Sequence, residues 1–273
     1  VRNVEIIPDL DLPGHSRNFA RVHPEILCDY TPDLRPTAGY DYRSVWCASR
    51  EENYRLLADI LGELAALFPS EYLHIGGDEA SKRGWRTCPE CAARMRREGL
   101  KDVDELQSYL VHRIGTFLAA RGRRLLGWDE ILQGGLAPGA TVMSWRGTEG
   151  GIEAAKLGNR VIKAPRSYSY TDYHQTADPE RNGEPLSIGR NVPIRKLYGY
   201  DPFDRLDEAQ SRNILGVQAN LWTEYISTMD HAEYMLLPRL AAMSEVAWAT
   251  ERRDYDDFVR RLGSLRGLYD REG

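Results

Sequence analysis

An apolar run meets a glycine pair and two adjacent acids in the stretch Tyr72-Leu73-His74-Ile75-Gly76-Gly77-Asp78-Glu79-Ala80. The apolar run predicts a short buried strand, and the glycine pair lets the backbone break out of it. Both acids can then turn toward one cavity, where two neighbouring carboxyl groups do not ionise independently and one keeps its proton to higher pH. That arrangement suits a general acid beside a charged partner. The alternative interpretation is a helix start, with Asp78 as its cap and Glu79 in its first turn.

Short apolar runs alternate with helical patterns along the whole chain. Strands are predicted at residues 4–7, 72–75, 124–127, 141–144, 160–163 and 214–219. Helices are predicted at residues 51–68, 103–120, 152–157, 232–247 and 255–268. Regular alternation of strand and helix predicts an α/β fold with a parallel sheet and right-handed crossovers. No linker rich in Pro, Gly or Ser divides the 273 residues, a length that is ordinary for one α/β barrel domain.

Acids and aromatic residues follow directly after the predicted strands. In chain order these are Asp9, Asp11 and His15; Asp78 and Glu79; Trp128, Asp129 and Glu130; Trp145 and Arg146; Tyr170 and Asp172; and Trp222 and Glu224. A (β/α)₈ barrel builds its active site from the loops at the carboxyl ends of its strands, so these strand ends predict one shared site. A doubly wound open sheet also binds its ligand at strand ends, but from fewer of them.

The residue types at these strand ends favour a sugar ligand. Trp128, Trp145 and Trp222 would form an aromatic wall, on which the apolar face of a sugar ring stacks. Pairs of residues spaced two apart lie on one face of an extended segment, where they can act together. These pairs are Tyr170 with Asp172 and Trp222 with Glu224. The alternative for each aromatic residue is a packing role in the core. The chain contains no G-x-S-x-G elbow, Walker loop or H-E-x-x-H motif, so the pattern favours glycoside chemistry over acyl or phosphoryl transfer.

The charge balance argues against two classes of partner. The net charge is −5, from 36 Lys and Arg against 41 Asp and Glu. This balance gives no electrostatic basis for binding nucleic acid or an anionic membrane. No apolar run approaches the length that spans a bilayer. We therefore expect neither nucleic acid nor a membrane as a partner.

The chain contains four cysteines, Cys28, Cys47, Cys88 and Cys91. The C-x-x-C spacing of Cys88 and Cys91 is typical of a redox pair or of half a zinc site. A second C-x-x-C is absent, and Cys28 and Cys47 are poorly spaced as the other half. We therefore expect structural or disulfide-bonded cysteines and no metal.

Seven segments of the chain occur in an order that matches one known family. They are residues 7–16, 74–80, 127–132, 143–147, 170–173, 218–224 and 244–248. Together they resemble glycoside hydrolase family 20, the β-N-acetylhexosaminidases, over nearly the whole chain.

The resemblance implies a (β/α)₈ barrel and a retaining, substrate-assisted mechanism. Glu79 would be the general acid that protonates the glycosidic oxygen, and afterwards the base that activates water. Asp78 would hold the substrate's 2-acetamido group, whose carbonyl oxygen attacks the anomeric carbon to give an oxazolinium intermediate. Tyr170 would donate a hydrogen bond to that oxygen. The other implied roles are hydroxyl binding by Asp172 and Glu224, walls formed by Trp128, Trp145 and Trp222, and support of the acid by Asp11 and His15.

The resemblance also implies that the chain begins at the third barrel strand. Residues 1–273 would then be a single catalytic barrel domain that contains strands 3 to 8 and lacks the first two βα units of a longer protein. The expected substrates are β-linked N-acetylhexosamine glycans, with terminal GlcNAc or GalNAc at the ends of chitooligosaccharides or glycoconjugates. No metal or organic cofactor is implied, and the substrate class favours a secreted or periplasmic location over a cytoplasmic one.

Two alternatives remain from the residues alone. The first is a non-catalytic, sugar-binding barrel remnant that keeps the tryptophan wall. The second is a conventional retaining glycosidase with Glu79 as the acid and either Glu224 or Asp11 as the nucleophile. The second alternative predicts equal treatment of glucosides and N-acetylglucosaminides.

Overall fold

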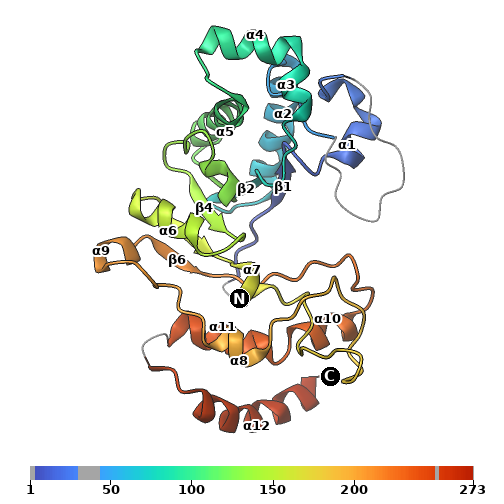
Figure 1. Ribbon diagram of the computed structural model, residues 1–273, viewed down its shortest axis with the longest axis vertical. Coiled ribbons are helices and arrows are strands. Elements are labelled where there is room, and N and C mark those ends of the chain that lie inside the picture. The colour runs from blue at the N-terminus through green and yellow to red at the C-terminus, as the bar shows by residue number, and fades with distance from the viewer. Residues whose placement is uncertain (1–3, 30–43, 250–251, 273) are drawn as a thin grey trace. The chain divides into compact units, whose positions relative to one another are not determined.

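The computed structural model describes residues 4–29, 44–249 and 252–272 (Figure 1). The chain divides into two compact units, unit 1 (Val1–Met143) and unit 2 (Ser144–Gly273). Unit 1 contains the strands β1 (Asp9–Leu12), β2 (Tyr72–Gly76), β3 (Arg124–Trp128) and β4 (Thr141–Ser144), which ends at the boundary. Its helices are α1 (Arg17–Val22), η1 (Pro24–Ile26), α2 (Glu51–Leu67), α3 (Arg83–Thr87), α4 (Pro89–Glu98), α5 (Val103–Ala119) and η2 (Asp129–Leu132).

Unit 2 has two strands and seven helices among its described residues. The strands are β5 (Val161–Lys163) and β6 (Ile214–Val217). The helices are α6 (Glu149–Lys156), α7 (Arg166–Ser169), α8 (Ile194–Tyr198), α9 (Glu208–Ser211), α10 (Met229–Leu236), α11 (Arg239–Trp248) and α12 (Tyr255–Glu272).

The strands of unit 1 are all parallel and follow the order of the chain. β1 pairs with β2, β2 with β3 and β3 with β4, with Tyr72 opposite Arg124 and Leu126 opposite Thr141. Side chains of this sheet are buried, as the short apolar runs predict: Leu73, Ile75 and Leu126 are at most 1% exposed. The carboxyl ends of parallel strands meet at one edge of a sheet, so the loops after β1, β2 and β3 are brought together.

Helices α2 and α5 lie side by side in unit 1 (Figure 1). Leucines spaced along one stripe of α2 are buried, including Leu57 and Leu61. The helix ends at Leu67, just before Phe68 and Pro69, because proline has no N–H to continue it. At the start of α5, the Asp102 carboxylate accepts hydrogen bonds from the backbone of Asp104 and Glu105, at 2.9 and 3.0 Å.

Unit 2 is held together by an aromatic core. β5 and β6 pair in parallel, with Val161 opposite Ile214. α8 and α11 pack together (Figure 1). Phe258 of α12 stacks on Tyr198 of α8, with ring centroids 4.9 Å apart. The loop that follows β5 contributes Tyr170 to the same core, and Trp145 packs against it.

The first predicted strand is wrong. Residues 4–7 form no strand, and the strand begins at Asp9. In the parallel register Asp9 lies opposite His74, so residues 4–6 come before the point where β2 begins and have no strand opposite them. Val4 and Ile6 are accordingly 76% and 65% exposed. Asp9 and Asp11 therefore lie within the first strand and not after it.

The predicted helix at residues 232–247 is also wrong. Two helices, α10 and α11, cover this region and meet at Pro238. Proline lacks an N–H group and clashes with the preceding turn, so it breaks the helix although the apolar pattern runs through it. The break places Arg239 at the start of α11, where it is fully buried.

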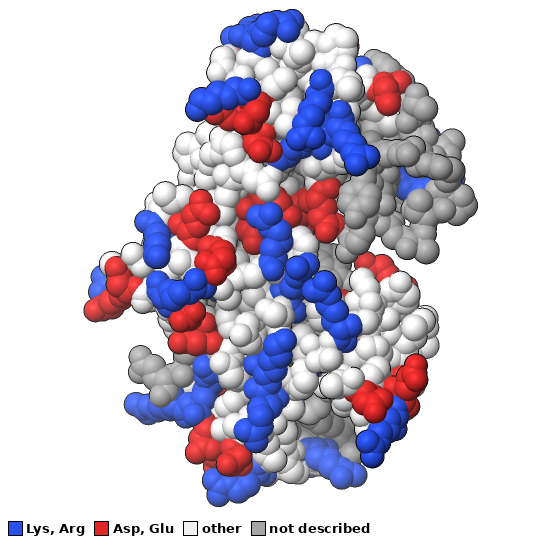
Figure 2. Space-filling view, in the orientation of Figure 1, with Lys and Arg blue, Asp and Glu red and all other residues white. Residues whose placement is uncertain are grey.

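The other strands and helices confirm the predicted α/β alternation, with boundaries shifted by a few residues. Closure of a barrel, its assignment as strands 3 to 8, and the single domain over residues 1–273 stay predictions. On the face drawn in Figure 2, basic and acidic side chains are interspersed. None of the helices in the described residues is both long enough and apolar enough to cross a membrane.

Candidate active site

Asp78 and Glu79 lie in the loop that follows β2, and α3 begins only at Arg83. The helix-start alternative is therefore wrong. Gly76 and Gly77 have φ angles of +69° and +95°, which side chains disfavour. A Cβ on Gly76 would overlap the Asp11 side chain, and one on Gly77 would lie 2.5 Å from Ile131 Cγ2. The glycine pair is thus required both by the backbone conformation and by close packing.

His15 joins the two acids. Its Nε2 lies 3.3 Å from Asp78 Oδ2 and 3.5 Å from Glu79 Oε2. Hydrogen bonds to Asp78 and then to Glu79 raise the pKa of His15 to about 10, so the imidazole is a cation at neutral pH. His15 and Glu79 both have left-handed backbone conformations, with φ of +50° and +46°. Such strain is found at functional sites, where the surroundings hold it in place.

Asp11 is the carboxyl group that keeps its proton. Burial, and then the negative charge of Asp78, raise the pKa of Asp11 to about 9. At neutral pH Asp11 is therefore a neutral acid next to Asp78. One oxygen of each, Oδ1, is buried and has no hydrogen-bond partner among the described residues.

Asp11, His15 and Asp78 place one potential metal-ligand atom each within 4.8 Å of one another. A metal needs the lone pair of a neutral imidazole, and the raised pKa of His15 keeps this ring protonated. A protonated Asp11 is likewise a poor ligand for a hard cation. The cluster therefore suits proton handling better than metal binding.

Three residues that the sequence analysis missed fix the loops of this cluster. Trp46 Nε1 donates to Ser16 Oγ at 2.8 Å, and Ser16 Oγ donates to the Gly14 carbonyl at 2.8 Å, which braces the turn that carries His15. Gln107 Nε2 donates to the Gly77 carbonyl at 3.0 Å and to the Glu130 carbonyl at 3.3 Å. Gln107 could have been found from the sequence, because it is a polar residue within the buried stripe of α5. Ser16 and Trp46 have no comparable feature in the sequence.

Trp128 ends β3 and is 3% exposed. Its indole meets the His74 ring edge-on, with centroids 4.9 Å apart. His74 Nδ1 lies 2.9 Å from Asp9 Oδ1, so this ring pair is tied to the first strand. The predicted wall residue is thus a buried indole that packs against the strand carrying the acids.

In unit 2, Tyr170 and Asp172 are aligned with the loop that contains Trp222 and Glu224. The Thr171 N–H donates to the Asn220 carbonyl at 2.7 Å, which extends the pairing of β5 and β6 beyond both strands. The Tyr170 and Trp222 rings lie 6.4 Å apart. Trp145 lies 6.3 Å from Tyr170 on a nearly parallel plane. The structure therefore brings Trp145, Tyr170 and Trp222 into one aromatic cluster, as predicted.

Burial shifts the pKa values of the polar groups in this cluster. Burial raises the pKa of Tyr170, so the phenol stays a neutral donor. Asp172 is 4% exposed, and burial raises its pKa to about 7, with a further rise from the negative charge of Glu224. Asp172 Oδ1 is buried and has no hydrogen-bond partner among the described residues.

Arg239, which the sequence analysis missed, positions the Tyr170–Asp172 loop. It is fully buried and donates to the carbonyls of Thr171, Tyr173 and Val192, at 2.5, 2.8 and 3.2 Å. Burial lowers the pKa of Arg239 to about 10, so it remains a cation at neutral pH. Its signal in the sequence is a lone charge inside the apolar string Met-Leu-Leu-Pro-Arg-Leu-Ala-Ala-Met.

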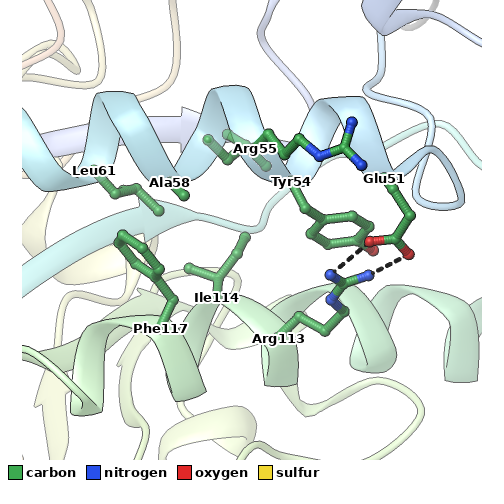
Figure 3. A pocket seen from close by; sticks show the side chains of 9 residues that line it. Glu51, Tyr54, Arg55, Ala58, Leu61, Arg113, Ile114 and Phe117 are labelled. Carbon is green, nitrogen blue, oxygen red and sulfur yellow. Dashed lines mark hydrogen bonds and ion pairs between the residues drawn. The ribbon is translucent and has the colours of Figure 1, made fainter.

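A cavity of about 250 Å³ lies elsewhere in unit 1, between α2 and α5 (Figure 3). Its walls are Tyr54, Leu61 and Phe117, and the ion pair of Glu51 with Arg113 closes one end. It opens between two helices and contains none of the predicted site residues. The candidate active site is therefore at the strand ends.

The chain matches solved structures over almost its entire length. The crystal structure of an exo β-N-acetylglucosaminidase from Vibrio harveyi in complex with N-acetylglucosamine matches with a TM-score of 0.85 and 31% identity, covering 98% of this chain and 43% of that one. Residues 1–251 match the model of glycosyl hydrolase family 20, catalytic domain, and the chain belongs to this family. The resemblance and the α/β fold class drawn from the sequence are thereby confirmed.

Two curated relatives are also similar. A β-hexosaminidase of Porphyromonas gingivalis strain W83 is 42% identical over 265 residues, which are 96% of this chain and 34% of that protein. A β-hexosaminidase of Vibrio furnissii is 34% identical over 247 residues, which are 89% of this chain and 40% of that protein. The chain thus spans about a third to two fifths of the length of these relatives.

Proposed function

We propose that this chain carries the acid and sugar-binding groups of a retaining exo-β-N-acetylhexosaminidase. The observation that carries the proposal is the arrangement of His15 across the adjacent Asp78 and Glu79, beside a protonated Asp11. Two neighbouring acids fixed by one cation suit a reaction in which one acid moves a proton and the other orients the substrate. The relatives named β-hexosaminidase, and the N-acetylglucosamine bound in the Vibrio harveyi structure, support the substrate class.

In the first step, Glu79 gives its proton to the glycosidic oxygen as the bond to the anomeric carbon breaks. The carbonyl oxygen of the substrate's own 2-acetamido group forms a bond to that carbon and yields an oxazolinium ion. Asp78 accepts a hydrogen bond from the acetamido N–H, which orients the group and stabilises its positive charge. Tyr170 donates a hydrogen bond to the acetamido oxygen. Because the nucleophile belongs to the bound substrate, the reaction has the advantage of an intramolecular attack.

In the second step, the Glu79 carboxylate takes a proton from water as the water oxygen attacks the anomeric carbon. The ring of the oxazolinium ion opens and the acetamido group is restored. Two successive inversions retain the configuration of the sugar. Asp172 and Glu224 accept hydrogen bonds from the sugar hydroxyls, and the rings of Trp145 and Trp222 stack on the sugar. The buried Trp128 acts through its packing on His74.

The raised pKa of Asp11 argues against one alternative. A conventional retaining glycosidase needs an ionised nucleophile, and Asp11 is neutral below about pH 9. We propose instead that the Asp11 proton and the His15 cation hold Asp78 in position. The natural substrates would be terminal GlcNAc or GalNAc residues of chitooligosaccharides or glycoconjugates, in a secreted or periplasmic location.

The test is hydrolysis of p-nitrophenyl N-acetyl-β-glucosaminide beside the matching β-glucoside by the full-length protein. We expect cleavage of the N-acetyl substrate alone, and a fall in kcat/KM of about 10²–10⁴-fold in Glu79→Gln. Glu63→Gln, an exposed position on α2, is the matched control and should leave the rate unchanged. Equal cleavage of both substrates would favour a nucleophile such as Glu224. Quenching of tryptophan fluorescence by GlcNAc without turnover would favour the sugar-binding remnant.

A further inference from the structure

The four cysteines of unit 1 converge on one point. All four sulfur atoms lie within 4.8 Å of one another, and every thiol is free. Cys91 Sγ is 3.8 Å from Cys28 Sγ and 3.7 Å from Cys47 Sγ. Cys47, Cys88 and Cys91 are at most 5% exposed. These positions correct the expectation that Cys28 and Cys47 are badly placed to complete a site with Cys88 and Cys91.

The convergence results from the path of the chain between β1 and α2. The Cys47 N–H donates to the Ile26 carbonyl at 2.7 Å, so the segment before α2 returns to the end of η1, close to Cys28. Cys88 caps the N-terminus of α4, and Cys91 lies in its first turn. Spacing along the sequence does not reveal this contact, because it depends on two segments that meet only in the fold.

The sulfur positions fit a tetrahedral metal site. A zinc ion bound by four thiolates at about 2.3 Å places neighbouring sulfurs about 3.8 Å apart. A disulfide would require about 2.05 Å. Cys91 is equally close to two partners, so the arrangement is one cluster of four and not two separate pairs.

The backbone around the cluster is fixed by buried polar side chains. Asn53 Nδ2 donates to the carbonyls of Ile26 and Cys47, both at 2.9 Å, and so ties the two ligand-bearing segments together. Arg50 donates to the Cys28 carbonyl at 3.0 Å and to the Glu25 carbonyl at 2.7 Å. Supporting contacts of this kind orient the ligands of metal sites. The guanidinium of Arg50 and the N-terminus of α4 also place positive charge beside the sulfurs, where it stabilises thiolates.

The cysteine-bearing helix α4 is in turn anchored to the rest of unit 1. Arg94 donates to the Ser49 carbonyl at 2.9 Å and pairs with Glu51 of α2. Glu51 also pairs with Arg113 of α5, at 2.8 and 2.9 Å, as Figure 3 shows. The three helices therefore hold the Cys88–Cys91 turn in place against the other two cysteines.

We propose that Cys28, Cys47, Cys88 and Cys91 bind one structural zinc ion. Binding exchanges the four thiol protons for four sulfur–zinc bonds and releases the protons, with no change of oxidation state. A closed set of four protein ligands leaves no position for water, which is typical of a structural site and not of a catalytic one. The site lies apart from the acids and is independent of the proposed glycosidase function.

The zinc site would also support the turn that carries His15. Trp46 precedes Cys47, and its N–H donates to the Pro13 carbonyl at 3.0 Å, while its indole braces Ser16. Loss of the metal frees Cys47 and so loosens Trp46. The turn between Pro13 and Ser16 would then lose its support, although the metal touches none of the acids.

The experiment is metal analysis of the full-length protein, purified with reductant and without chelator. We expect one zinc per chain and its loss in Cys88→Ser. Asp11→Asn is the matched control, because it removes a ligand from the other cluster of potential metal ligands and should leave the zinc in place. Zinc that is lost in Asp11→Asn and retained in Cys88→Ser would overturn the proposal. So would a zinc-free protein whose intact mass shows two disulfides.

A second measurement avoids dependence on the folding of Cys88→Ser. Titration of the wild-type protein with an organomercurial should release one zinc as four thiols react, and cobalt in place of zinc should give thiolate charge-transfer bands and tetrahedral d–d bands. In Cys28→Ser, which keeps three thiolates, a chelator should remove the metal about tenfold faster or more. Cobalt spectra without thiolate bands would contradict the assignment.

Discussion

The strand-end loops of the two units hold their functional side chains in different ways. In unit 1 the acids are fixed by charge and by strained backbone: His15 contacts both Asp78 and Glu79, and two of these three residues have positive φ angles. In unit 2, Tyr170 and Asp172 are buried and their loop is fixed by one buried arginine, whereas Trp222 and Glu224 are exposed. Charged neighbours keep His15 protonated in unit 1, whereas in unit 2 burial keeps Tyr170 neutral and raises the pKa of Asp172 to about 7.

The largest effect should come from breaking the strained loop of unit 1 with Gly76→Ala. The new methyl group overlaps the Asp11 side chain at a residue whose φ is +69°, so we expect a loss of about 4 kcal/mol in the free energy of unfolding. Chemical denaturation of the protein measures this change. Activity should also fall, because Asp11 is displaced from Asp78.

Gly122→Ala is the matched control for that substitution. Gly122 has nearly the same φ of +68°, but nothing lies within 4 Å of its Cβ position. Its cost should be only the backbone strain, about 1–2 kcal/mol. Equal losses in the two variants would show that the contact with Asp11 contributes nothing.

A smaller effect should come from removing the buried cation of unit 2 with Arg239→Met. The carbonyls of Thr171, Tyr173 and Val192 lose their donor, and we expect a loss of about 3 kcal/mol in stability. Arg195→Met, at a position 72% exposed on α8, should change stability by less than about 1 kcal/mol. Thermal unfolding compares the two. A similar small change in both would mean that the loop does not depend on Arg239.

Gly76 and Arg239 also show what could and could not be predicted from the sequence. The role of Gly76 is visible locally, because a glycine pair between an apolar run and two acids predicts a tight turn whatever lies around it. The role of Arg239 depends on three carbonyls from two distant loops and on a helix break at Pro238, which the apolar pattern of residues 232–247 concealed. A one-dimensional pattern reports local conformation and burial, but not which distant backbone groups a side chain satisfies.

The cysteines and the first strand follow the same rule. Residues 4–7 are as apolar as a strand, yet a strand requires a partner, and β2 begins too late to supply one to residues 4–6. Cys28 and Cys47 are poorly spaced along the chain, yet a backbone hydrogen bond from Cys47 to Ile26 brings them together. Contacts set by the fold therefore decided the features that the sequence analysis missed, whereas the order of the seven sequence segments was enough to identify the family.

The smallest expected effect is a pH dependence of KM, because the titrating groups of the two units have different pKa values. Asp172 has a pKa raised to about 7, whereas the pKa values of Asp11 and His15 are raised to about 9 and 10. Between pH 6 and 8 the state of Asp172 therefore changes, while Asp11 and His15 stay protonated. Because a carboxylate accepts hydrogen bonds from sugar hydroxyls better than a carboxylic acid does, KM should fall up to about tenfold as the pH rises through this range.

The same titration has an effect of opposite sign on stability. A carboxyl group whose pKa is raised in the folded protein stabilises the fold while it is protonated, so unit 2 should lose stability as the pH rises from 4 to 7. In Asp172→Asn both dependences should disappear, because an amide does not titrate; Asp230→Asn, at an exposed position on α10, should keep them. If KM of Asp172→Asn still falls across this range, the titrating group is not Asp172. The pH dependence of KM would then have to come from the acids of unit 1.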